Sequence, residues 1–111
     1  MIPPLTAEEF KTMVPEWAQK LTQQRCPIVK GLPVYDVLYG SKYSTIKCHG
    51  IVEEFFPCDE RCALTRDHGL SGHVLVKYPG GSSSGLAAYW VPDMETKEGR
   101  LHVEKWESGK I

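Results

Sequence analysis

Cysteine and histidine are concentrated in one stretch of this chain, between residues 48 and 73. Three of the four cysteines and three of the four histidines lie there: Cys48, Cys58, Cys62, His49, His68 and His73. Zinc in proteins takes four tetrahedral nitrogen and sulfur ligands, usually supplied as two close pairs. Three residues separate Cys58 from Cys62 and four separate His68 from His73, and both spacings suit such pairs. These four residues are therefore the candidate zinc ligands.

Ordinary thiols and surface histidines are the competing interpretation of this stretch. Alternate residues of a strand share a face, so Cys48 is a small core residue if Ile46 points inward, and His49 then points outward. The two candidate pairs also lie closer together along the chain than those of a zinc finger, and no finger-like helix follows them. We expect a protein without a cofactor, with a zinc-stabilised domain as the alternative.

A second motif resembles the nucleophile turn of a hydrolase. Residues 81–85 read G-x-S-x-G, and Asp93 and His102 follow in hydrolase order. That mechanism needs a strained strand-to-helix turn in a wide sheet, whereas three successive serines are typical of a flexible connection. The chain is also about half as long as such a fold requires. A serine nucleophile is not expected.

Cysteine with histidine gives a third possible chemistry, with Cys58 or Cys62 as nucleophile and His68 as base. A reactive thiolate needs a neighbouring cation or a helix N-terminus. The two arginines of this segment are balanced by nearby carboxylates. We therefore assign no catalytic residue and keep a small Cys/His-dependent enzyme as the second alternative.

Aromatic side chains offer a binding surface instead of a reaction. Tyr35 and Tyr39 share one face of an expected strand, Trp90 ends another, and Trp106 points outward from the last. Small barrels hold peptides on aromatic residues with polar rims, although most of these rings would form the core in the competing interpretation, since a domain of this size must bury several large side chains. We predict a small non-enzymatic binding protein for an unknown protein or peptide partner, using these four residues. A homodimer through the last strand is a further possibility, because an edge strand can pair with a second copy.

The N-terminal segment carries the helical signals that would position these residues. Thr6 and Glu9 fit a capping box, and Leu5 and Phe10 fit its hydrophobic staple. An apolar stripe at helical spacing follows, made of Phe10, Val14, Trp17 and Leu21. Because Pro15 interrupts this stripe, residues 7–24 are expected to form a kinked helix or a helical hairpin.

The remainder of the chain alternates with a period of two, which indicates strands. Strands are expected at residues 34–39, 44–56, 73–78, 86–91 and 100–106, with a bend near Gly50. Residues 79–85 are expected to be a flexible connection. These elements predict an α+β fold, in which the helical segment packs on a strongly bent five-stranded antiparallel sheet. A small SH3-like barrel is the preferred form.

Length and charge limit the remaining classes. A chain of 111 residues is expected to be one domain, with a helical segment at 7–24 and a β-rich segment at 33–106. The net charge of -1 gives no basic surface for nucleic acid. No apolar run approaches the ~20 residues of a membrane span, and no secretory signal is recognisable, so we expect a cytoplasmic protein.

Overall fold

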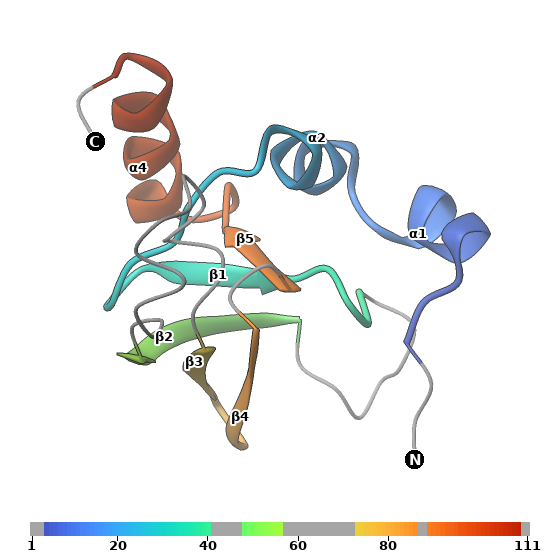
Figure 1. Cartoon of the computed structure of the whole chain (residues 1–111), viewed down its shortest axis with the longest axis horizontal. Helices are drawn as coiled ribbons and strands as arrows, with labels where there is room; N and C mark the ends of the chain where they lie inside the picture. Colours follow the sequence, from blue (N-terminus) through green and yellow to red (C-terminus); the bar gives the residue numbers. More distant parts are fainter. Residues whose placement is uncertain (1–3, 41–47, 57–72, 87–88, 110–111) are drawn as a thin grey trace, which may run out of the picture.

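The computed structural model describes residues 4–40, 48–56, 73–86 and 89–109 (Figure 1). The described helices are α1 (Ala7–Met13), α2 (Glu16–Gln24) and α4 (Lys97–Glu107). The described strands are β1 (Pro33–Asp36), β2 (His49–Phe56), β3 (His73–Tyr78), β4 (Gly81–Leu86) and β5 (Trp90–Pro92). The predicted α+β fold with a five-stranded antiparallel sheet is confirmed.

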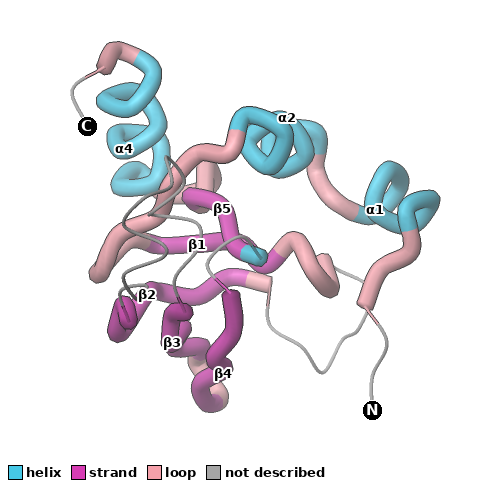
Figure 2. Tube along the Cα trace, in the orientation of Figure 1, coloured by secondary structure: helices cyan, strands magenta, loops and turns pink. Residues whose placement is uncertain are grey.

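The sheet has the strand order β4-β3-β2-β1-β5, and every neighbouring pair is antiparallel. The last strand in the chain thus lies beside the first. Figure 1 shows α2 and α4 near β1 and β5, whereas the β3–β4 hairpin extends away from the helices. Figure 2 shows the same division, with β2, β3 and β4 farthest from α2 and α4. The helices therefore cover only one end of the sheet.

Two apolar clusters lie on opposite faces of β1 and β5. The first packs under the helices and contains Val14, Ala18, Leu21, Cys26, Tyr35, Val37, Val91 and Val103. The second lies against the bent part of the sheet and contains Ile28, Leu32, Val34, Val52, Val74, Val76 and Trp90. Successive strand side chains point to opposite faces, so Val34 and Tyr35 enter different clusters, as do Trp90 and Val91. Strands β1 and β5 are consequently buried on both faces.

Trp90 connects the two ends of the sheet. Its Nε1 donates to the hydroxyl of Tyr78 at 3.1 Å, and burial raises the pKa of Tyr78 to about 12. Gly85 of β4 lies directly against the indole, because a Cβ added there would be 3.2 Å from a ring carbon of Trp90. The sheet is therefore bent enough to bring β4 near β5. In the described residues β4 pairs only with β3 and β5 only with β1, so the sheet is not closed into a barrel.

The helical segment is a hairpin, the second of its two predicted forms. The capping box is present: Thr6 Oγ1 accepts from the backbone N–H of Glu9, and the Glu9 carboxylate accepts from that of Thr6. Helix α1 ends at Met13 because Val14, the residue before Pro15, is extended with ψ 130°. Pro15 is then the N-cap residue of α2, where its missing N–H removes no hydrogen bond within the helix.

The strand predicted at residues 100–106 is wrong, because these residues belong to helix α4. Its N-cap is Thr96, whose Oγ1 accepts from the backbone N–H of Gly99 at 3.0 Å. Leu101 and Val103 were expected to share the inward face of a strand, but Val103 is buried while Leu101 is exposed. A homodimer through a C-terminal edge strand has no such strand to use.

The flexible connection predicted at residues 79–85 is also wrong. After a turn at Pro79 and Gly80, residues Gly81–Leu86 form β4 in continuous register with β3. The serines of β4 are exposed, so this edge strand has none of the apolar alternation by which a strand is recognised. The strand predicted at 86–91 is thereby divided, with Leu86 ending β4 and Trp90 beginning β5.

The predicted ends of two other strands also shift. Strand β1 ends at Asp36, not at residue 39, because the chain turns there and the N–H of Gly40 donates to the carbonyl of Asp36 at 3.2 Å. The bend predicted near Gly50 lies slightly later in β2, where the register with β3 shifts between Val52 and Glu54. Residues 44–47 of that predicted strand lie outside the described residues.

The carboxyl group of Asp36 holds the turn after β1 and is buried. Its Oδ1 accepts from the backbone N–H groups of Leu38 at 2.8 Å and Tyr39 at 3.3 Å. Burial nevertheless raises the pKa of Asp36, because it outweighs these hydrogen bonds, which act in the lowering direction. The ionised form therefore costs folding free energy.

We expect Asp36→Asn to reveal this cost through pH dependence. Asparagine retains the acceptor oxygen and removes the charge. Because the folded pKa of Asp36 lies above the unfolded one, the folded chain binds this proton more tightly. The wild-type protein should therefore gain stability relative to the variant as the pH falls through the raised pKa. Urea unfolding of both proteins across the acidic range measures the difference, and an opposite slope would show that the hydrogen bonds dominate.

Candidate functional site

The predicted zinc ligands are mostly beyond what the structure describes. Cys58, Cys62 and His68 lie outside the described residues, and His73 is exposed at the start of β3. Cys48 is partly buried, and its thiol contacts the carbonyl of Gly40. The zinc hypothesis for this set of four residues stays a prediction.

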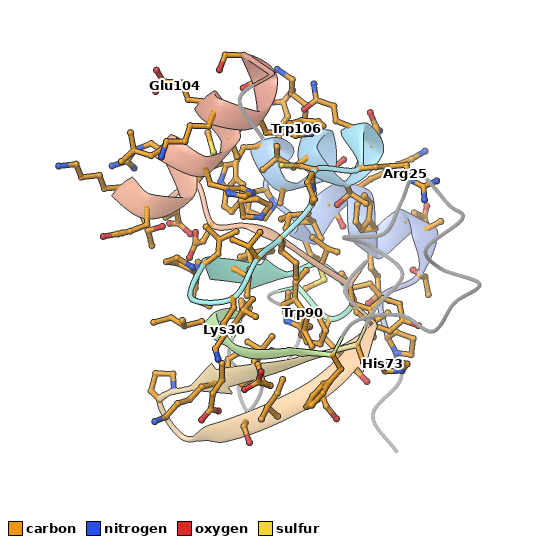
Figure 3. The ribbon with its side chains drawn as sticks, turned by 60° about the vertical axis from the view of Figure 1, so that its left-hand side comes forward. Arg25, Lys30, His73, Trp90, Glu104 and Trp106 are labelled. Carbon is orange, nitrogen blue, oxygen red and sulfur yellow. The ribbon has the colours of Figure 1, made fainter. Side chains whose placement is uncertain are left out.

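The predicted aromatic surface is not assembled in the structure. Tyr35 is 1% exposed and Trp90 is 4% exposed, so both belong to the core and offer no face to a partner. The physical reason is that β1 and β5 are covered on both faces. Tyr39 is half-buried, and Trp106 is half-buried on α4 at the side that faces α2 (Figure 3).

The structure instead brings together His49, Asp93 and Glu95. Nδ1 of His49 lies 2.7 Å from Oδ2 of Asp93, and Nε2 lies 3.2 Å from Oε2 of Glu95. Each ring nitrogen thus faces a carboxylate oxygen. The ring of Tyr35 packs edge-on against the imidazole, with centroids 5.2 Å apart. We call these three residues the His49 cluster.

Strand β1 places the members of the His49 cluster side by side. Tyr35 of β1 is in register with His49 of β2 on one side and with Val91 of β5 on the other. Two residues after Val91, the backbone N–H of Asp93 donates to the carbonyl of Pro33 at 2.9 Å. The start of β2 and the end of β5 therefore meet across β1, although 44 positions separate His49 and Asp93 in the chain.

Asp93 is the fixed member of the His49 cluster. Its side chain is 3% exposed, whereas those of His49 and Glu95 are 51% and 59% exposed. Its Oδ1 accepts from the backbone N–H of Glu95 at 3.0 Å, and its carbonyl accepts from the Thr96 hydroxyl at 2.8 Å. The carboxylate that orients His49 is thus held by the turn that leads into α4.

An open groove of about 860 Å³ adjoins the His49 cluster. It runs over the uncovered end of the sheet between the β3–β4 turn and the first turn of α4, and its lining includes His49 and Asp93. Ile51, one of the lining residues, is 51% exposed. The exposed charged residues along the groove are Glu53, Lys77 and Glu98, while Asp93 also lines it but is buried against His49. Exposed carboxylates therefore outnumber the lysine by two to one.

Two members of the His49 cluster carry sequence signals for other roles. His49 belongs to the Cys/His stretch and Asp93 to the hydrolase-like order, whereas no motif of the sequence points to Glu95. His102, the third residue of that order, lies on α4 and its Nε2 is 2.8 Å from the carbonyl of Pro27. Thr96, the N-cap of α4, is a local signal for the turn that contains Asp93, but nothing local indicates that His49 lies beside it.

Comparison of the chain with models of known protein families, with curated proteins and with solved structures found no match. In the described residues, no helix is both long enough and apolar enough to cross a membrane. The groove and the His49 cluster are therefore the features from which a function can be inferred.

Proposed function

We propose that this domain is a small non-enzymatic binding module that takes a short basic peptide in the groove beside the His49 cluster. The observation that carries the proposal is the combination of exposed Ile51 with an excess of carboxylates along one open groove. The binding role agrees with the sequence analysis, but the surface is a different one.

The size and lining of the groove suit a short peptide. Its volume of about 860 Å³ lies within the roughly 300–1,000 Å³ of ordinary ligand sites. Pro33, Ile51 and Pro79 offer apolar surface that an aliphatic side chain would remove from water. Such a ligand would gain most of its affinity from this contact.

The charge of the groove determines whether it favours a basic or an acidic ligand. Glu53 and Glu98 belong to different elements, the strand β2 and the helix α4, and both line the groove. Complementary charge favours a lysine or arginine side chain between them and disfavours an acidic peptide. Lys77 weakens this preference for a basic ligand but does not reverse it.

We also propose the finer form of the fold, an SH3-like barrel left open between β4 and β5. The position of β5 beside β1 and the contact of Trp90 with Gly85 support it. Fold alone does not determine function, so the peptide proposal depends on the groove and not on this likeness.

An NMR titration tests the peptide proposal. A short peptide of alternating lysine and leucine should shift the amide signals of Ile51, Lys77 and Glu98, and its glutamate counterpart should not. Equal binding of both peptides, or shifts confined to other surfaces, would contradict the proposal.

A charge reversal at the groove provides the matched variant. Glu98→Lys should weaken binding of the lysine peptide by roughly tenfold or more, because it places like charges together. Glu104→Lys, an exposed position on the same helix that does not line the groove, makes the same change in net charge. It should leave the affinity nearly unchanged.

A further inference from the structure

We infer that the His49 cluster binds a divalent first-row transition-metal ion at the end of the groove. One ligand atom from each of His49, Asp93 and Glu95 lies within 4.8 Å of the other two. This inference does not depend on the peptide proposed for the groove.

The ligand atoms of the cluster lie somewhat farther apart than those of a ligand shell. With metal–ligand bonds of about 2.0–2.1 Å, two ligand atoms of a tetrahedral ion lie about 3.3–3.4 Å apart, whereas those of the cluster lie within 4.8 Å of one another. One ion takes only one imidazole nitrogen, because the two ring nitrogens point in opposite directions, and here each faces a different carboxylate. Rotation of the half-exposed His49 and Glu95 side chains would bring one nitrogen and both carboxylates around an ion.

The donor set selects the class of ion. One imidazole nitrogen with two carboxylate oxygens suits Mn²⁺, Fe²⁺ and Zn²⁺ better than the soft ions that prefer thiolates. Three protein ligands leave coordination positions for water or for a ligand atom. Because His49 and Asp93 line the groove, these positions would face it.

The environment of Asp93 indicates that this ligand is already held in place. A buried carboxylate is costly unless a cation faces it, and His49 is the group that faces Oδ2 of Asp93. The other oxygen of Asp93 is occupied by the backbone N–H of Glu95, and Tyr35 supports the imidazole edge-on. Asp93, held in this way, loses little conformational freedom on binding, which favours affinity, whereas the exposed His49 and Glu95 side chains are the adjustable ligands.

Paramagnetic NMR with Mn²⁺ on the full chain, treated with a chelator beforehand, tests the inference. Mn²⁺ is chosen because the four cysteines bind it poorly and so do not compete for it. We expect early broadening of the amide signals of Gly50, Met94 and Glu95, while that of Ser83 in β4 stays sharp. Zn²⁺ should displace the Mn²⁺ and restore the signals. Broadening centred elsewhere, or none, would overturn the inference.

Two variants make the test specific. Glu95→Gln changes an exposed side chain and should weaken Mn²⁺ binding by at least about 10–100-fold, because even the loss of a group that only supports a ligand has that effect at other metal sites. His73→Gln, an exposed histidine of β3, should bind Mn²⁺ like the wild type. Unchanged affinity in Glu95→Gln would contradict the site. The peptide titration is carried out without metal, so either proposal can fail while the other stands.

Discussion

Replacement of Trp90 by alanine is expected to lower the free energy of unfolding by about 3–5 kcal/mol, the usual cost of removing a buried Trp side chain. The indole fills the second apolar cluster between β5 and the β3–β4 hairpin, where Figure 3 places it. Gly85 lies against the ring, so its loss leaves a cavity between the two ends of the sheet. The bend of the sheet depends on this contact.

Conservative variants separate the packing of Trp90 from its hydrogen bond. Trp90→Phe keeps a ring but loses the donor, and we expect a smaller loss than for alanine. Tyr78→Phe keeps the indole but leaves its buried N–H without this acceptor, at a cost of about 1–3 kcal/mol. Leu101→Ala, at an exposed position of α4, is the control and should change stability by less than about 1 kcal/mol.

Urea unfolding followed by far-UV circular dichroism measures the free energy of unfolding of the four variants. Circular dichroism is chosen because the fluorescence signal would itself change when Trp90 is replaced. A Trp90→Ala midpoint equal to that of Leu101→Ala would show that the sheet holds its bend without the indole. That result would also remove support for the SH3-like form of the fold.

The elements that could be predicted are those determined by neighbouring residues. The capping box of α1 needs only Thr6 and Glu9, and the break before α2 needs only Pro15. Polar and apolar residues alternate clearly along β3, and a turn follows it. This strand was predicted with the observed bounds, His73–Tyr78. Local physics suffices in each case.

The elements that were missed depend on contacts distant in sequence. The serines of β4 form a strand because β3 supplies hydrogen-bond partners along their whole length, not because they are strand-forming residues. Tyr35 was predicted to lie on the surface, but residues of α2 and α4, from opposite ends of the chain, pack over it. Periodicity along one strand gives no information about such a cover. Its apolar neighbour Val34 was a local hint that β1 is buried on both faces.

The site was harder to predict than the fold for the same reason. His49 and Asp93 meet only because β1 pairs with β2 and β5 at once. Strand pairing between residues so far apart cannot be deduced from periodicity, which describes each strand by itself. The turn that positions Asp93 could be recognised locally from Thr96, had α4 been predicted as a helix.

The glycine at position 99 provides the second large prediction. Glycine inside a helix is unfavourable relative to alanine by about 1 kcal/mol, so intrinsic helix propensity predicts that Gly99→Ala would stabilise α4. The structure predicts the opposite. A Cβ at residue 99 would lie 2.6 Å from the carbonyl carbon of Asp93 and closer still to its oxygen. These are backbone atoms, which cannot rotate away as a side chain would.

We therefore expect Gly99→Ala to lower the free energy of unfolding by about 3 kcal/mol or more, at the upper end of overpacking effects. The first turn of α4 and the backbone of Asp93 must move apart, which disturbs the turn that holds the Asp93 side chain. In any folded fraction, the NMR signals of the His49 ring should shift and Mn²⁺ binding should weaken. Gly80→Ala, where an added Cβ meets no atom within 4 Å, is the control and should change stability by less than about 1 kcal/mol. Urea unfolding compares the two variants, and a Gly99→Ala protein more stable than wild type would mean that helix propensity outweighs the close contact between α4 and Asp93.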